Sequence, residues 1–398
     1  MSKKNENFFK EKKQWSEVKD ALLGCYFKPY FAKISSTLKP LCYIDCFAGK
    51  GKFEDEKDGS PLIVQKIISS MDSSIRNYVK LYFIELNHAT ELENNLIELQ
   101  NQSVSCQVVS GRFEDNINII LNKNQNSNVF LYIDPYGIKA LDIPMLNSFA
   151  RLFNSVELLI NFNTFGFIRE ACRVKKANKI LDEELFEFLI EYDTSNVSSI
   201  QELNRIAGGT FWQDIIDDYI SDVISVYEAE RRIADGIQKS FSNYKYVLNM
   251  PIKAKDHTTP KYRMFFVTNH NEGCLLMVDN MFRRSKESQI SRNNGQICLF
   301  SLDVEGELIN DEEIAQKILS MITNKEIRLN DLLSSFFVEF GIVADSKKVK
   351  EILKKYEENN IINIRREPMF TSKGKLSKFM TDESKQNGQK VFVRRARQ

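Results

Sequence analysis

Leu41-Cys-Tyr-Ile-Asp-Cys-Phe-Ala-Gly-Lys-Gly-Lys52 decides the fold, because an apolar run here ends in an acid and meets two glycines one residue apart. This pattern is typical of a buried strand that delivers the backbone into a tight loop beneath a nucleotide-like ligand. Gly49 and Gly51 let the main chain approach a ligand where a Cβ would clash, and Asp45 lies at the strand's carboxyl end, where α/β sheets bind ligands. A purely structural turn explains the same two glycines, so the rest of the chain has to decide.

The composition is that of a globular protein. The chain has 398 residues, 42% of them apolar, which is long enough for two or three domains. No apolar run approaches the ~20 residues of a membrane span, and no secretion signal follows the first charges, so we expect a cytoplasmic protein without a membrane segment. The seven cysteines show no metal-ligand spacing and only three histidines are present. We therefore expect reduced, mostly buried thiols and no metal site.

Further apolar runs separated by helical patterns predict a doubly wound, Rossmann-like α/β sheet. A helix over 15–35 comes first, so we expect a helical lead-in over 1–40 and the sheet domain over 41–303. The predicted strands after the first span 78–85, 104–109, 128–134, 156–162, 262–270 and 296–300.

A helical, charged region of about 168–242 interrupts the sheet domain. It contains predicted helices over 181–190 and 212–233, with a break at Gly208-Gly209. An insertion before the sheet resumes is expected to lie over the strand tips as a lid or substrate platform. A structural helical bulge is the alternative.

Two later strands end in residues suited to an adenosine. Glu85 ends the second strand, where an acid is placed to accept hydrogen bonds from ribose hydroxyls. A solvated acid at a strand end is the alternative. Arg112 and Phe113 follow the third strand and are candidates for the edge and face of the adenine base, although Phe113 equally fits the core.

The fourth strand ends in Asp134-Pro135-Tyr136-Gly137, the sharpest chemical signal in the chain. A strand-tip acid followed by proline and an aromatic gives a rigid turn, a fixed acceptor and a ring face for a planar, amine-bearing group. Such a site can hold an exocyclic amino nitrogen with its lone pair turned toward an electrophilic methyl group. A plain Pro-Gly turn after a strand is the alternative.

The C-terminal region, 311–398, changes to short helices followed by two strands, which predicts a winged-helix domain. From 341 onward it holds 15 Lys or Arg and 7 Asp or Glu, a net charge of +8. A basic helix and wing suit a phosphate backbone, with a domain for protein contacts as the alternative. The candidate nucleic-acid-binding residues are Lys347, Lys348, Lys350, Lys354, Arg365 and Arg366.

Taken together, the two turn motifs resemble the first and fourth motifs of class I S-adenosylmethionine-dependent methyltransferases. The closer resemblance is to the three-Cys-motif partner family (TcmP), whose motifs recur in the same order. They stand here as Asp45 to Gly51, Gly59 to Leu62, Asp134 to Gly137 and Tyr262 to Gly273. The resemblance implies a methyltransferase-like fold and a partner protein with a three-cysteine motif, similar to radical S-adenosylmethionine enzymes.

The resulting hypothesis is a methyltransferase that modifies an amino group of nucleic acid. Its candidate S-adenosylmethionine-binding residues are Asp45, Phe47, Gly49, Gly51, Glu85, Arg112 and Phe113, and its candidate catalytic residues are Asp134, Pro135 and Tyr136. Asn161 or His270 would help to shape the pocket. Two alternatives stay open: a non-catalytic scaffold for the three-cysteine protein, and a methyltransferase for small molecules or proteins.

Overall fold

The computed structural model describes residues 12–97, 104–153, 155–176, 197, 199–253, 259–292, 302–383 and 388–396. The chain divides into two compact units, an N-terminal unit (Met1–Asn269) and a C-terminal unit (His270–Gln398). The sequence ended the first domain at residue 303. The structure instead groups helix α14 (Asn271–Arg292) with the C-terminal unit, where it packs against α16 (Leu329–Phe340) and α17 (Ser346–Glu358).

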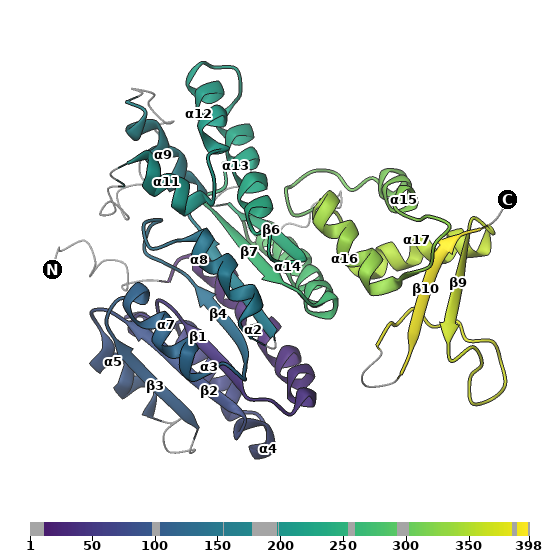
Figure 1. Ribbon diagram of the computed structural model, residues 1–398, viewed down its shortest axis with the longest axis horizontal. Coiled ribbons are helices and arrows are strands. Elements are labelled where there is room, and N and C mark those ends of the chain that lie inside the picture. The colour runs from purple at the N-terminus through teal and green to yellow at the C-terminus, as the bar shows by residue number, and fades with distance from the viewer. Residues whose placement is uncertain are drawn as a thin grey trace. The chain divides into compact units, whose positions relative to one another are not determined.

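A seven-stranded, mostly parallel sheet forms the N-terminal unit, as predicted (Figure 1). Its strand order is β3-β2-β1-β4-β5-β7-β6, and β7 runs antiparallel to both of its neighbours. The order reverses between β1 and β4, which makes this the switch point where open α/β sheets bind ligands. The strands are β1 (Leu41–Asp45), β2 (Val79–Glu85), β3 (Ser105–Ser110), β4 (Asn128–Ile133), β5 (Ser155–Phe162), β6 (Tyr246–Ile252) and β7 (Tyr262–Thr268).

The end of the sheet differs from the prediction. Strand β6 was not predicted, and it pairs with β7 at the sheet's edge. The predicted strand 296–300 lies outside the described residues.

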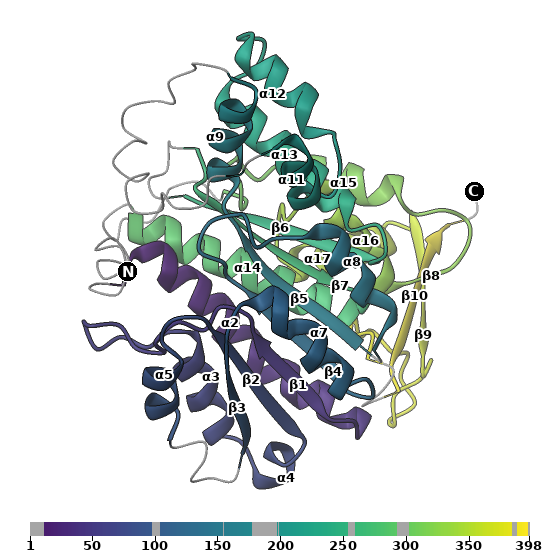
Figure 2. The same cartoon turned by 60° about the vertical axis from the view of Figure 1, so that its left-hand side comes forward.

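Helix α2 (Gln14–Ile34) packs on one face of the sheet; Figure 2 shows it in purple, running along the strands. Its aromatic rings meet rings of the strands: Phe27 lies 5.3 Å from Phe130 and 4.8 Å from Tyr43 between ring centroids. The predicted helix is therefore present and is packed on the sheet through its aromatic side chains. Among the described residues, shorter helices connect the first strands: α3 (Ser60–Ser69), α4 (Ser73–Arg76), α5 (Ala89–Asn95) and α7 (Phe113–Lys123).

A buried carboxyl group lies between α2 and the sheet. Glu157 of β5 is 1% exposed and accepts hydrogen bonds from the hydroxyls of Tyr26 (2.6 Å) and Thr268 (3.0 Å). Burial raises its pKa from 4.5 to about 7, although the two hydroxyls act in the opposite direction. Folding is therefore linked to proton uptake at this position.

Because the folded protein binds this proton more tightly than the unfolded chain, stability should fall as pH rises from about 4.5 to 7 and then level off. A Glu157→Gln variant keeps the shape and removes the titration. We expect its unfolding free energy to decline less over this window, by about 1–3 kcal/mol. Urea unfolding at pH 5, 6, 7 and 8 measures this free energy for both proteins. If it depends on pH in the same way in both, the linkage to Glu157 is contradicted.

The helices after β5 belong to the main core. They are α9 (Thr164–Val174), α11 (Ile200–Ala207), α12 (Trp212–Ile220) and α13 (Val226–Ser240), and the predicted helix 212–233 is broken between the last two. Trp212 and Ile233 are fully buried in the same apolar cluster as Ile160 of β5. This packing favours the structural alternative over a free lid for these helices. The predicted helix 181–190 lies outside the described residues.

Gly208 confirms the predicted break in this region. It ends α11 in the left-handed conformation (φ +74°), and a Cβ there would lie 2.6 Å from Ile143 in α8 (Ile143–Ser148).

In its described residues, the C-terminal unit combines helices α14 to α17 with a small antiparallel sheet of order β8-β10-β9. Helix α15 (Asp311–Ser320) packs against α16 and α17, and α16 contacts β8 and β10. The strands are β8 (Ile327–Arg328), β9 (Ile362–Glu367) and β10 (Lys390–Arg395). The predicted helices and the two predicted strands are present, and β8 is an additional short strand. Across the described part of both units, no helix has the length and apolar character to cross a bilayer.

Candidate functional site

A cavity of about 740 Å³ lies at the carboxyl ends of the parallel strands in the N-terminal unit. The loops after β1, β2, β3 and β4 all contribute to its lining, as expected where the strand order reverses. Of the predicted site residues, the lining includes Phe47, Gly49, Gly51, Glu85, Arg112, Phe113, Asp134, Pro135, Tyr136 and Asn161.

The glycine loop has a backbone that other residues would strain. Gly49 and Gly51 both have positive φ angles, +65° and +81°. A Cβ on Gly51 would lie 2.9 Å from Leu92 Cδ1, and the Gly51 carbonyl accepts a 2.8 Å hydrogen bond from Gly59 N–H. The two glycines therefore allow the loop to curve against the cavity.

Asp45 does not face the cavity, contrary to the prediction that it binds the cofactor. It has no exposed surface, and its carboxylate accepts hydrogen bonds from Ser60 Oγ (2.6 Å) and Phe47 N–H (3.3 Å). Burial raises its pKa to about 7. Asp45 thus holds the glycine loop in place through its hydrogen bonds with Ser60 and Phe47. Gly59 occupies the N-cap position of α3, so the Ser60 hydroxyl is available to donate to Asp45.

Glu85 ends β2 with its carboxylate held by backbone amides. Oε1 accepts from Asn87 N–H (2.8 Å) and His88 N–H (3.1 Å), and Oε2 accepts from Gly49 N–H (2.8 Å). A carboxylate offers about four acceptor positions, so Oε2 keeps one for a ligand hydroxyl. Phe113 is 3% exposed and packs 5.3 Å from Phe47 between ring centroids. It is therefore a core residue at the cavity wall, while Arg112 is exposed.

Asp134 is held by two donors from distant parts of the chain. Lys19 Nζ donates to Oδ2 at 2.6 Å, and Asn161 Nδ2 donates to Oδ1 at 2.7 Å. The Lys19 side chain is 8% exposed and the Asp134 side chain 23%, so the ion pair is largely screened from water. Lys19 Nζ also lies 5.5 Å from the ring centroid of Tyr262. The carboxylate is thereby fixed beside Pro135 and Tyr136 in the lining.

The sequence did not identify Lys19. A lysine on an amphipathic helix, 115 positions before Asp134, carries no local sign that it faces a cavity.

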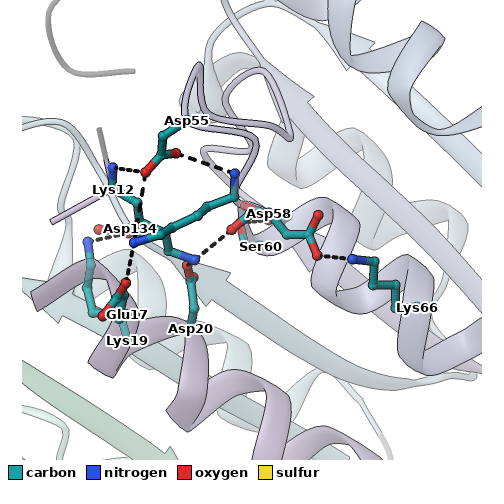
Figure 3. Close-up of polar contacts among 11 residues, drawn as sticks. Lys12, Glu17, Lys19, Asp20, Asp55, Asp58, Ser60, Lys66 and Asp134 are labelled. Carbon is teal, nitrogen blue, oxygen red and sulfur yellow. Dashed lines mark hydrogen bonds and ion pairs between the residues drawn. The ribbon is translucent and has the colours of Figure 1, made fainter. Parts of the chain in front are cut away.

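The first turns of α2 are tied to the loop 50–60 beside the cavity, as Figure 3 shows. Lys12 N–H donates to Asp55 Oδ2 (3.1 Å), and Lys57 Nζ lies 2.7 Å from Glu17 Oε1. The Lys12 ammonium pairs with Asp20, whose pKa burial nevertheless raises to about 6. Ser16, Lys19 and Asp20 line the cavity. The lead-in helix is therefore part of the site.

The two described histidines lie in different places. His88 lines the cavity and occupies the N-cap position of α5, where its Nδ1 lies 3.2 Å from Glu91 Oε2. His270 is exposed in the C-terminal unit, where its carbonyl accepts from Cys274 N–H. His257 and Cys298 lie outside the described residues. In the part of the chain that is described, no three His, Cys, Asp or Glu residues group as metal ligands.

The comparisons with known proteins assign the chain to no family. No family model and no curated protein matches it. A solved structure from Legionella pneumophila, assigned to the family DUF519, is 14% identical with a TM-score of 0.35, covering 70% of this chain and 94% of that one. An O-methyltransferase family protein from Burkholderia thailandensis is 8% identical with a TM-score of 0.29, covering 61% and 54%. These TM-scores are too low to carry an argument.

The predicted basic footprint of the C-terminal unit divides into exposed and structural residues. Lys347 and Lys354 are exposed on α17, whereas Lys348 Nζ lies 2.6 Å from Asp311. Arg366 is 9% exposed and forms two 2.7 Å hydrogen bonds to Glu357. Arg366 therefore stabilises the fold of the C-terminal unit. It is not available as one of the predicted nucleic-acid-binding residues.

Arg365 is also engaged within the unit. Its guanidinium lies 4.0 Å above the ring of Phe392 and 2.9 Å from Glu326 Oε2.

Proposed function

We propose that the N-terminal unit is a class I S-adenosylmethionine-dependent methyltransferase that acts on an amino group of nucleic acid. The observation that carries the proposal is the meeting of the glycine loop, Glu85 and the Asp134-Pro-Tyr turn around one cavity. The strand order supports it, because its reversal between β1 and β4 puts these residues at the point where open α/β sheets bind ligands.

The residues present fit the cofactor. The positive φ angles of Gly49 and Gly51 leave room for its methionine end, which the loop amides would stabilise. Glu85 keeps one acceptor position for a ribose hydroxyl. Phe47 and Arg112 line the cavity where an adenine base would lie. When bound, S-adenosylmethionine supplies an electrophilic methyl group.

The acceptor amine would be held by the fourth-strand turn. Asp134 presents a carboxylate fixed by Lys19 and Asn161, and an amino group can donate one N–H to it. Tyr136 is partly exposed in the lining and offers a ring face to a planar base. Holding the amine in this way turns its lone pair toward the methyl donor, and proximity and orientation lower the barrier.

Homopolymeric RNA tests the proposed reaction. Uracil has no exocyclic amino group, whereas adenine and cytosine each have one. We expect the purified chain, with S-adenosylmethionine labelled in the methyl group, to label poly(A) or poly(C) and to leave poly(U) unlabelled. Labelling of poly(U) at the same rate would contradict amine chemistry.

Lys19 should act as a positioning residue. A Lys19→Met variant removes the cation from Asp134 while keeping the volume of the side chain. We expect methyl transfer to fall by about 10- to 100-fold with cofactor affinity nearly unchanged, because the lysine orients the carboxylate and not the cofactor. Partial rescue of kcat by Lys19→Arg, at an unchanged melting temperature, separates positioning from folding. Equal loss of cofactor affinity would contradict this role.

A non-catalytic scaffold is the second candidate, and one observation favours it. Both oxygens of Asp134 already accept hydrogen bonds, as in a structural ion pair. In that case the three-cysteine-motif partner would bind to the chain and Asp134→Asn would leave the partner's activity intact. Co-purification of the two proteins, followed by activity assays with the wild type and this variant, tests the partner in both candidates.

The C-terminal unit would bind the nucleic acid. Its helices α15 to α17 and strands β9 and β10 suit a winged-helix domain, with Lys347, Lys350 and Lys354 along α17. Phosphate contacts release counterions, so binding should weaken steeply as salt concentration increases. Binding that is insensitive to salt would favour a small-molecule or protein substrate.

A further inference from the structure

A short, well-formed hairpin follows β9 in the C-terminal unit, where Figure 1 shows the chain projecting past the strand. Phe370 and Leu376 are paired across it in an antiparallel bridge. Thr371 N–H donates to the Lys375 carbonyl (2.8 Å), and Gly374 N–H donates to the Thr371 carbonyl (2.9 Å). These bonds close a tight turn, so the hairpin has a defined shape.

The hairpin exposes large apolar side chains. Phe370 is 51% exposed and Leu376 is 60% exposed. Residues directly opposite each other in an antiparallel pair project to the same face, so the two side chains form one apolar pair. Clustered apolar groups on a surface mark interaction sites more often than single ones do.

Three lysines accompany this pair. Lys373, Lys375 and Lys378 are exposed, and within the described residues none of them has an ion-pair partner. Several other basic residues of the unit are paired, for example Lys348 with Asp311 and Arg366 with Glu357. The hairpin therefore combines available positive charge with an exposed apolar pair.

We propose that this hairpin is a wedge for duplex nucleic acid, with the lysines on phosphates and the Phe370–Leu376 pair packed against a base step. Proteins that kink a duplex insert apolar side chains between base pairs while cations contact the backbone. The turn itself, Ser372-Lys373-Gly374, is polar and charged, so its lysine can lie beside a phosphate of the duplex. The wedge rests on the nucleic-acid part of the proposed function and not on the cofactor site.

The test uses the full chain and a DNA duplex that carries 2-aminopurine, whose fluorescence increases when the base unstacks. We expect the wild type to raise the fluorescence several-fold and Phe370→Ser to abolish most of the increase. Leu308→Ser is the matched control, because Leu308 is 66% exposed in the same unit but outside the hairpin; it should behave as the wild type. The double variant Lys373→Gln/Lys375→Gln should reduce the slope of log affinity against log salt by about 2.

Two outcomes would overturn the wedge. Salt-sensitive duplex binding without a fluorescence change, and without an effect of Phe370→Ser, would show that the hairpin does not enter the stack, while the proposed methyltransferase would stand. Binding to phosphatidylserine vesicles that Phe370→Ser abolishes, without binding to the duplex, would identify a membrane contact instead. Failure of the methylation assay with an intact fluorescence response would contradict the proposed enzyme alone.

Discussion

An Asp134→Asn variant should transfer methyl groups at least ~100-fold more slowly than the wild type while it binds S-adenosylmethionine with similar affinity. The carboxylate offers only acceptors to the substrate amine, whereas an amide can turn an NH₂ donor toward it. The proposed cofactor-binding residues Gly49 and Glu85 lie at the ends of other strands, so we expect them to be unaffected. Single-turnover rates and calorimetric titrations of the two proteins measure the two quantities separately.

The control for this variant concerns Lys19, because removal of the carboxylate leaves a lysine that is 8% exposed without its counter-charge. The loss of a partner from a buried pair costs about 3–5 kcal/mol, so Asp134→Asn should also lower the melting temperature. The double variant Lys19→Met/Asp134→Asn should recover much of the stability without activity. If the double variant recovers methyl transfer as well, the carboxylate is not catalytic.

The second large effect is expected at Gly51. A Gly51→Val variant should lose cofactor affinity by at least ~100-fold, because its φ of +81° strains any side chain and the new Cβ would lie 2.9 Å from Leu92 Cδ1. Relief of the φ strain requires the loop backbone to move, and this backbone lines the cavity beside Glu85. Cofactor-induced thermal stabilisation at several S-adenosylmethionine concentrations measures the affinity.

Gly341→Val is the matched control for this variant. Its φ is +77°, and the structure shows nothing within 4 Å of the new Cβ. It should lower stability and leave the cofactor affinity of the N-terminal unit intact. Equal cofactor binding by wild type and Gly51→Val would contradict the placement of the cofactor at the glycine loop.

Strands β1 and β4 were predictable because each contains a buried apolar run that leads to an acid at the cavity end of the sheet. Burial of Leu41 to Ile44 and of Val129 to Ile133 forces such composition, and parallel strands place their ends at one edge. Strand β6 was not predictable from local pattern. Asn249 and Pro251 interrupt it, yet Asn249 accepts a hydrogen bond from Arg263 and Pro251 is tolerated because β6 is an edge strand.

The parts of the site that were missed depend on tertiary packing. Nothing local distinguishes Lys19 from other lysines of its helix, and only the fold brings it to Asp134. The predicted ligand-binding roles of Asp45 and Arg366 differ from the structure for the converse reason. A polar residue at a strand end or on a basic strand is expected to face a ligand, but both side chains turn inward to Ser60 and Glu357.

The most direct test of the proposed cofactor site is isothermal titration of the full chain with S-adenosylmethionine, and separately with NADH. We expect binding of S-adenosylmethionine at one site per chain, lost in Glu85→Ala, and no binding of NADH. Loss in Glu85→Ala follows from the ribose contact, because an alanine removes the free acceptor on Oε2. A folded wild type that binds no S-adenosylmethionine, with or without nucleic acid, would contradict the methyltransferase and favour the scaffold.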